Sequence, residues 1–179
     1  MPLDAYVFVE EAAVNLVDTV TQKRATDPDQ VKEVRFIATI TGPFAGFATV
    51  EVDERSALDG VLARHFRDVG AEGLQTAIPI RMGPLQVQHR PPPQPPSTTA
   101  LVRIHCRAGD ASAVLDATAD LPGYFGSAIV LGDFDVLLEL IAESADELEE
   151  RILGGLGGLP GIHSSETALV LQSAHRDQE

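Results

Sequence analysis

The pattern of apolar and polar positions runs twice along this chain. In residues 1–82, alternation with period two predicts strands, and apolar spacings of three and four predict helices. The predicted order is strand, helix, strand, strand, helix, strand, and residues 99–173 repeat it. Gly42 and Gly132 mark the same turn in the two copies, 132 − 42 = 90 residues apart. One repetition of so long a period indicates two copies of a small domain rather than a solenoid, which needs three or more short units.

The expected fold class is α+β, with two tandem ferredoxin-like (βαββαβ) domains packed through their sheet faces, as in a dimeric α+β barrel. The first domain is expected at 1–82 and the second at 99–173. A proline-rich linker, extended in the polyproline II conformation, is expected at 83–98, and a tail at 174–179.

The central hairpin of the second copy is apolar on both faces. The residues expected to face the helices are Phe134, Val136, Leu138 and Leu140. The residues expected on the opposite face are Ile129, Leu131, Leu137 and Ile141, interrupted by Glu139. Because a βαββαβ unit places both helices on one side of its sheet, the opposite face needs a cover. This pattern predicts assembly of sheet on sheet, within one chain or between chains.

Composition and charge argue against several classes of function. A formal net charge of −14, with 13 scattered basic residues, argues against direct binding of nucleic acid. The single cysteine, Cys106, excludes an intrachain disulfide and a cysteine zinc site, and its place in a strand favours an inert buried thiol. The five histidines lack metal-ligand spacing, so neither a metal nor another cofactor is expected. No signal segment and no long apolar run is evident, so a soluble, cytoplasmic protein with no membrane partner is expected.

Two further patterns are better explained by folding than by chemistry. The glycine-rich run at 154–161 follows a predicted helix and lacks the Gly-Lys-Ser/Thr ending of a phosphate loop, so it predicts a helix end. His65 lies on an apolar helix stripe and is expected to be a core histidine with a hydrogen-bond partner.

One constellation could bind a ligand. The turn Gly132-Asp133-Phe134-Asp135 and the terminal strand Ser165-Glu166-Thr167 belong to the same predicted sheet. Aspartates there could pair with a ligand ammonium group, while hydroxyls and backbone amides could bind its carboxylate. The alternative is that Gly-Asp simply makes the turn, since both residue types favour turns.

At these residues the chain resembles the effector-binding domain of the Lrp/AsnC family of transcription regulators. The motifs that carry the resemblance are Val102-Arg103-Ile104, Leu121-Pro122-Gly123, Gly132-Asp133-Phe134-Asp135-Val136-Leu137-Leu138, Leu159-Pro160-Gly161-Ile162 and Thr167-Ala168-Leu169-Val170-Leu171. The match spans about residues 100–171, and the first copy shares only Gly42, Phe44 and the Thr76-Ala77 strand.

The resemblance implies a ferredoxin-like domain that dimerises through its sheet, with amino-acid sites at interfaces of higher assemblies. It places Gly132, Asp133, Asp135, Ser165 and Thr167 in the ligand-binding site. Family members usually carry a helix-turn-helix domain before this domain, whereas here a second effector-like copy stands there. That first copy has Pro43, Ala45 and Leu74 where the second has Asp133, Asp135 and Ser165, so ligand binding is expected in the second copy alone.

The function predicted from the sequence is sensing of an amino-acid-like effector, as in transcription regulation, by a non-enzymatic protein that does not bind DNA itself. No catalytic residue is assigned. The expected partners are the small-molecule effector and either further copies in a homo-oligomer or another regulator. Two alternatives stay open: a cofactor-independent oxygenase or isomerase of the ferredoxin-like α+β barrel type, and a purely structural assembly partner.

Overall fold

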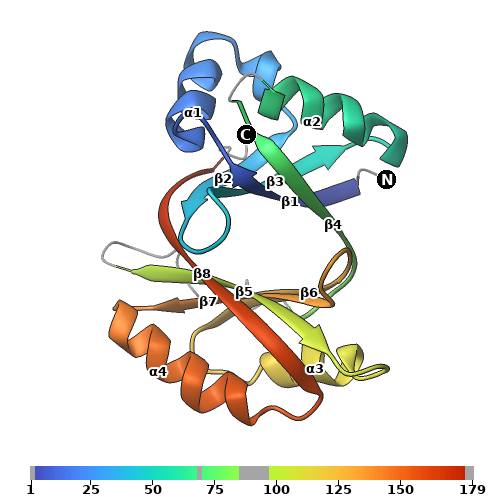
Figure 1. Ribbon diagram of the computed structural model, residues 1–179, viewed down its shortest axis with the longest axis vertical. Helices are drawn as coiled ribbons and strands as arrows, with labels where there is room; N and C mark the ends of the chain where they lie inside the picture. Colours follow the sequence, from blue (N-terminus) through green and yellow to red (C-terminus); the bar gives the residue numbers. More distant parts are fainter. Residues whose placement is uncertain (1–2, 68–69, 85–96, 176–179) are drawn as a thin grey trace. The chain divides into compact units, whose positions relative to one another are not determined.

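The computed structural model describes residues 3–67, 70–84 and 97–175 (Figure 1). The described residues divide into two compact units. Unit 1 comprises those of Met1–Ile78 and Val170–Glu179, and unit 2 those of Pro79–Leu169. Most of the predicted linker, 85–96, and the end of the predicted tail, 176–179, lie outside the described residues. The domain boundaries drawn from the sequence stay a prediction.

Each copy contains the expected order of elements. The first copy comprises β1 (Leu3–Glu11), α1 (Leu16–Thr26), β2 (Val34–Ile40), β3 (Gly46–Val52), α2 (Leu58–Phe66) and β4 (Glu72–Met82). The second comprises β5 (Thr98–Cys106), α3 (Ala111–Thr118), β6 (Tyr124–Leu131), β7 (Val136–Ala142), α4 (Ala145–Gly155) and β8 (Ile162–His175). Short 3-10 helices lie at Pro28–Val31, Arg55–Ala57 and Leu156–Gly158. The last of these continues α4 through the glycine-rich run, which is the helix end that the sequence predicted.

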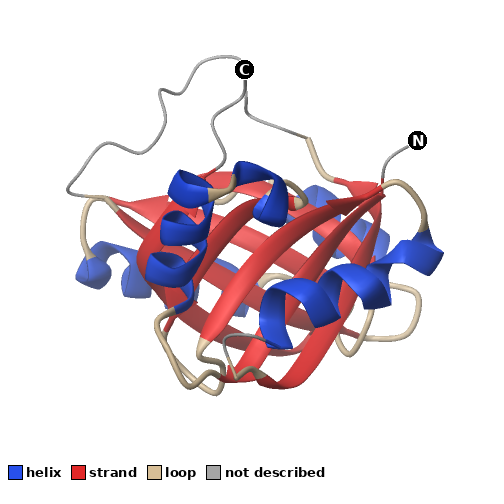
Figure 2. Cartoon of the chain, turned by 90° about the horizontal axis from the view of Figure 1, so that it is seen from above, coloured by secondary structure: helices blue, strands red, loops and turns tan. Residues whose placement is uncertain are grey.

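The strands pair antiparallel, so the chain is a mixed α+β fold with antiparallel sheets (Figure 2). In unit 1 the strand order is β4-β1-β3-β2, and the end of β8 pairs with β2 beyond that. In unit 2 the first part of β8 pairs with β5, followed by β7 and β6, with the end of β4 next to β6. The last strand of each copy therefore ends in the sheet of the other copy's unit. The predicted packing of the sheets face to face stays a prediction.

Polar contacts hold the end of β8 in unit 1 and the end of β4 in unit 2. In unit 1, the Gln172 side chain on β8 accepts a hydrogen bond from Asn15 (3.1 Å) and donates one to Asp18 of α1 (2.9 Å). In unit 2, Arg81 on β4 pairs with Asp116 of α3 (3.0 Å). The Tyr124 hydroxyl donates to the backbone carbonyl of Pro84 (2.9 Å). The end of β8 thus contacts the start of α1 in unit 1, and the end of β4 contacts α3 and β6 in unit 2.

Local signals fix the turns and helix starts. Ser144 accepts a hydrogen bond from the backbone amide of Glu147 (3.2 Å), the capping interaction that its spacing predicts. Gly123 and Gly161, each in a Leu-Pro-Gly turn, have φ of 80° and 89°. A Cβ on Gly123 would lie 2.3 Å from a backbone oxygen, so this turn requires glycine.

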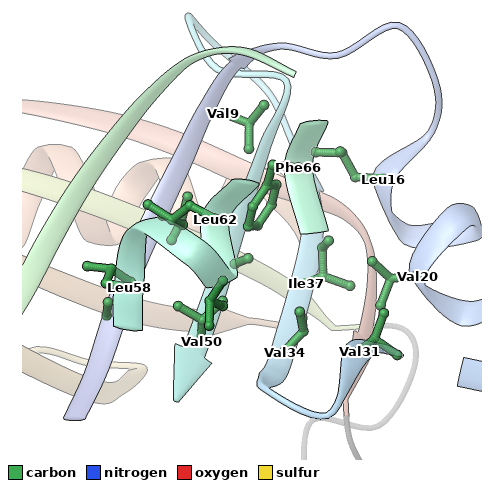
Figure 3. Packing of buried hydrophobic residues seen from close by; sticks show 14 of the residues in the cluster. Val9, Leu16, Val20, Val31, Val34, Ile37, Val50, Leu58, Leu62 and Phe66 are labelled. Carbon is green, nitrogen blue, oxygen red and sulfur yellow. The ribbon is translucent and has the colours of Figure 1, made fainter. Parts of the chain in front are cut away.

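Each unit has an apolar core between its helices and its sheet. In unit 1, Val9, Leu16, Val20, Ile37, Leu62 and Phe66 pack together (Figure 3). In unit 2 the core includes Val136, Leu138 and Leu140, as expected for the hairpin. Burial of a side chain of this size stabilises a fold by about 1.5–3 kcal/mol.

Two hairpin residues lie on the face opposite to the one expected. Ile129 packs against the helix-side core, because it stands opposite Val136 in the sheet. Phe134 lies beneath the guanidinium of Arg103. Arg103 stands opposite Leu137, on the face of the sheet turned away from the helices, so Phe134 lies on that face too. The prediction for these two was wrong because the turn between β6 and β7 interrupts the alternation on which it relied.

Among the described residues, no helix is both long and apolar enough to cross a membrane.

Candidate functional site

The β6–β7 turn presents two of the predicted site residues to solvent. Gly132 and Asp133 are exposed. Asp135 is half-buried, and its Oδ2 accepts a hydrogen bond from the backbone amide of Cys106 (2.7 Å). Its own amide donates to the carbonyl of Ile104 (3.0 Å). The Asp135 carboxylate therefore fastens the turn to the end of β5.

Ser165 and Thr167 lie on β8, on the other side of β5 from the turn. Both are exposed, and they stand opposite Ile104 and Val102 of β5. Ile104 in turn stands opposite Val136, which follows the turn. Two strand spacings separate β8 from β7, roughly 10 Å. The structure brings Gly132, Asp133 and Asp135 together in the turn, but not beside the two hydroxyls, and their role as one site stays a prediction.

Cys106, expected to be an inert buried thiol, is half-buried. Burial, with the nearby charges of Asp135 and Asp110, raises the pKa of the Cys106 thiol to about 11. At neutral pH the group is protonated, and the protonated thiol is not the nucleophilic form.

The face of the unit 2 sheet that its helices leave uncovered carries charged side chains that the sequence analysis did not assign to a site. We call it the helix-free face. One row across it reads Glu166 (β8), Arg103 (β5), Leu137 (β7) and Ala128 (β6). The next row reads Ala168, Leu101, Glu139 and Gly126 on the same strands.

Arg103 is the most buried charged side chain of this face. The residue is 7% exposed, and its guanidinium lies over the Phe134 ring, 4.9 Å from the centroid. Its NH1 is 3.4 Å from Glu166 Oε2, and the Glu166 side chain is 54% exposed. A cation over an aromatic face is electrostatically favourable, which helps to hold the guanidinium over the ring.

Glu139 lies in the neighbouring row. Burial raises the pKa of its carboxyl to about 7. An acid with this pKa can take up or release a proton near neutral pH. The signal in the sequence was Glu139 itself, the one charge that interrupts the otherwise apolar strand β7.

At the matching positions unit 1 carries aromatic side chains and a threonine, while the acidic pair Asp4 and Glu51 lies further along the same face. Phe8 occupies the position of Arg103, since it stands opposite Phe47 as Arg103 stands opposite Leu137. The Phe8 ring lies 5.0 Å from Phe47 and 5.2 Å from Phe44. Thr49 and Phe36 occupy the positions of Glu139 and Gly126. The two copies therefore share a fold but differ chemically on this face.

The predicted core histidine is confirmed. His65 is buried, with Nε2 3.0 Å from Glu33 Oε2. Burial lowers the pKa of the His65 imidazole despite the Glu33 carboxylate beside it. Among the described residues, no group of three or more His, Cys, Asp or Glu side chains is placed to hold a metal ion.

Solved structures of similar fold include enzymes. The siroheme decarboxylase NirDL, in complex with an iron-uroporphyrin III analogue, matches with a TM-score of 0.65 at 7% identity, over 96% of this chain and 72% of that one. A putative monooxygenase from Lactobacillus acidophilus matches with a TM-score of 0.56 at 10% identity, over 97% of this chain and 96% of that one. E. coli AsnC matches with a TM-score of 0.46 at 18% identity, over 52% of this chain and 66% of that one.

These likenesses correct the prediction that the protein is not an enzyme. Structures that match nearly the whole chain come from a decarboxylase and a putative monooxygenase, so this fold is one that enzymes use. At identities of 7% and 10% the likeness concerns the fold, and it does not assign a reaction to this chain.

The sequence comparison supports the resemblance inferred from the motifs. No curated protein matches this sequence. The family model of the Lrp/AsnC ligand binding domain matches residues 99–179, which cover the second copy from β5 onward. By this match, residues 99–179 are similar to the Lrp/AsnC ligand binding domain.

Proposed function

We propose that the protein senses a small amino-acid-like effector through its second copy and responds by changing its assembly. The observation that carries this proposal is the match of residues 99–179 to a ligand-binding domain family. A net charge of −14 makes contact with a phosphate backbone unfavourable. We therefore assign the output to association with further copies or with another regulator.

The exposed turn and the hydroxyls of β8 supply the chemistry that a zwitterion needs. Asp133 would pair with the ammonium group, and the Gly132 backbone with Ser165 and Thr167 would bind the carboxylate. Asp135 would act as a positioning residue, because its carboxylate already accepts the Cys106 amide.

The separation between these groups points to a site completed by a second copy. Within one chain, β5 stands between the turn and β8, and roughly 10 Å is too far for one amino acid to bridge. The turn of one chain meeting the β8 hydroxyls of another would bring both halves together. Effector binding would then favour the oligomer, because it adds free energy only to the associated state.

Thermal unfolding in the presence of each common L-amino acid tests the proposal. A ligand at 100 times its dissociation constant stabilises a protein by about 2.7 kcal/mol, which corresponds to a rise in Tm of roughly 5–10 °C for this size. Asp133→Asn and Thr167→Val should abolish the shift, whereas the exposed Asp53→Asn serves as the matched control. Light scattering should show a larger species with the active amino acid. If no amino acid changes either Tm or mass, the proposal is wrong.

A further inference from the structure

We propose that the helix-free face of unit 2 is a second binding site, which takes a small aromatic carboxylate. Arg103 would bind the carboxylate, Glu139 would share a proton with it, and the ring would lie beside Gly126. This site uses neither the β6–β7 turn nor the β8 hydroxyls.

Arg103 is prepared to bind a carboxylate. Its guanidinium lies over the Phe134 ring, and a guanidinium can bind a carboxylate through two parallel hydrogen bonds. Its contact with the Glu166 carboxylate, at 3.4 Å, is longer than the 2.7–2.9 Å typical of a tight charge-assisted hydrogen bond. Since the Glu166 side chain is 54% exposed, water can solvate its carboxylate when the contact with Arg103 is broken. A ligand carboxylate can therefore replace Glu166 at Arg103.

Gly126 leaves room for a ring. A Cβ built on Gly126 meets no atom within 4 Å, so the space beside this glycine is open. Gly126 stands directly opposite Glu139, on the same face of the sheet. In unit 1 the matching position holds Phe36, whose ring lies 6.0 Å from the Phe47 ring. Unit 2 thus lacks an aromatic ring at the position where unit 1 supplies its own.

Glu139 lies between the open space and the cation. Arg103 is its diagonal neighbour across β5 and β7, a separation of about 7–8 Å between backbones. A phenyl ring with a two-carbon acid side chain spans this distance. Burial is the cause of the raised Glu139 pKa, so the carboxyl is available in its protonated form to donate a hydrogen bond to the ligand.

The rest of the face suits the apolar body of such a ligand. Because Arg81 reaches α3, its neighbours Ile80 and Met82 on β4 point to the opposite, helix-free side. They are 58% and 51% exposed. Exposed apolar side chains beside buried charged ones are the composition of a small-molecule site.

Calorimetry with 3-phenylpropanoate tests the proposal. The charged groups on the strands of this face are Arg103, Glu139 and Glu166, together with titratable His105 one row further along β5. Because bound carboxylate favours protonated Glu139, affinity should fall about tenfold between pH 6 and pH 8. Titrations at pH 8 in buffers of different ionisation enthalpy should report uptake of close to one proton. The neutral amide, 3-phenylpropanamide, should not bind.

Variants separate this site from a structural role for the same residues. Glu139→Gln should keep the binding and lose its pH dependence, with exposed Glu150→Gln as control. Arg103→Lys should weaken binding at least tenfold, whereas exposed Arg107→Lys should not. Gly126→Val should block binding without loss of stability, because open space surrounds its Cβ and valine favours strands.

Three results would overturn the proposal: no binding of 3-phenylpropanoate at millimolar concentration, equal affinity at pH 6 and pH 8, or unchanged affinity in Gly126→Val. The effector hypothesis is tested with L-amino acids and turn variants, so either proposal can fail while the other holds.

Discussion

Glu139 should make the protein less stable at alkaline pH, and removing its charge should reverse the effect. Its pKa is raised from 4.5 to about 7 by burial. The folded state therefore binds more protons than the unfolded state between these values. The favourable contribution of protonated Glu139 is complete below pH 4.5 and is lost as pH rises through about 7. A shift of this size corresponds to about 3 kcal/mol at pH 8, an upper value because the side chain keeps some contact with water.

Urea unfolding of Glu139→Gln at pH 5 and pH 8 measures this directly. We expect the variant to exceed the wild type by about 2 kcal/mol at pH 8, and to differ little at pH 5. Glu150→Gln, on an exposed face of α4, should differ little at either pH. A Glu139→Gln effect of the same size at both pH values would refute the reasoning, because a difference in packing does not depend on pH whereas proton binding does.

Three other perturbations follow from the described contacts. Gly123→Ala should lower the unfolding free energy by about 2 kcal/mol or more, measured by urea unfolding, since φ is 80° and the new Cβ would lie 2.3 Å from a backbone oxygen. Asp135→Ala should cost about 1–3 kcal/mol by leaving the amide at the end of β5 without its carboxylate, and an unchanged midpoint would contradict this. In the Glu139→Gln background, stability should fall from pH 7 to pH 5, because burial keeps the pKa of the His65 imidazole below its usual value of 6.5 and the unfolded state then binds more protons; His65→Gln should lessen the fall.

Local patterns predicted the elements well because each depends on neighbours in the sequence. Ser144 and Glu147 cap α4 through a spacing visible in the chain, and the Leu-Pro-Gly turns place Gly123 and Gly161 where a positive φ is required. Strand pairing is different, because alternation fixes which face a residue occupies and leaves the partner strand open. The 14 residues of β8 read as one strand, and nothing in their alternation shows that its two parts pair with different copies.

The candidate site was harder to predict for a related reason. The turn motif drew attention to Asp133 and Asp135, because Gly and Asp are adjacent in the sequence and both favour turns. Arg103 and Glu139 are 36 residues apart, 139 − 103, and become neighbours only through the register of β5 and β7. Once the register is known, Glu139 changes from an interruption in an apolar strand to one part of a cluster.

The difference between the two copies indicates which residues of this face the fold does not require. Unit 1 fills its helix-free face with Phe8, Thr49 and Phe36 at the positions of Arg103, Glu139 and Gly126. The same backbone register is thus compatible with side chains that carry no charge. Replacing buried charged groups by apolar ones of fitting shape is often neutral or stabilising, by about 1–4 kcal/mol.

Placing the unit 1 residues at the matching positions of unit 2 should therefore abolish ligand binding and raise the unfolding free energy. The triple variant Arg103→Phe, Glu139→Thr and Gly126→Phe should unfold at a higher urea concentration than the wild type at pH 8, and should no longer bind 3-phenylpropanoate. The reverse transfer, Phe8→Arg with Thr49→Glu in unit 1, should destabilise, because it buries charges where an aromatic cluster now packs. If the first variant were less stable than the wild type, Arg103 and Glu139 would be needed for folding, and their charge would require no ligand to explain it.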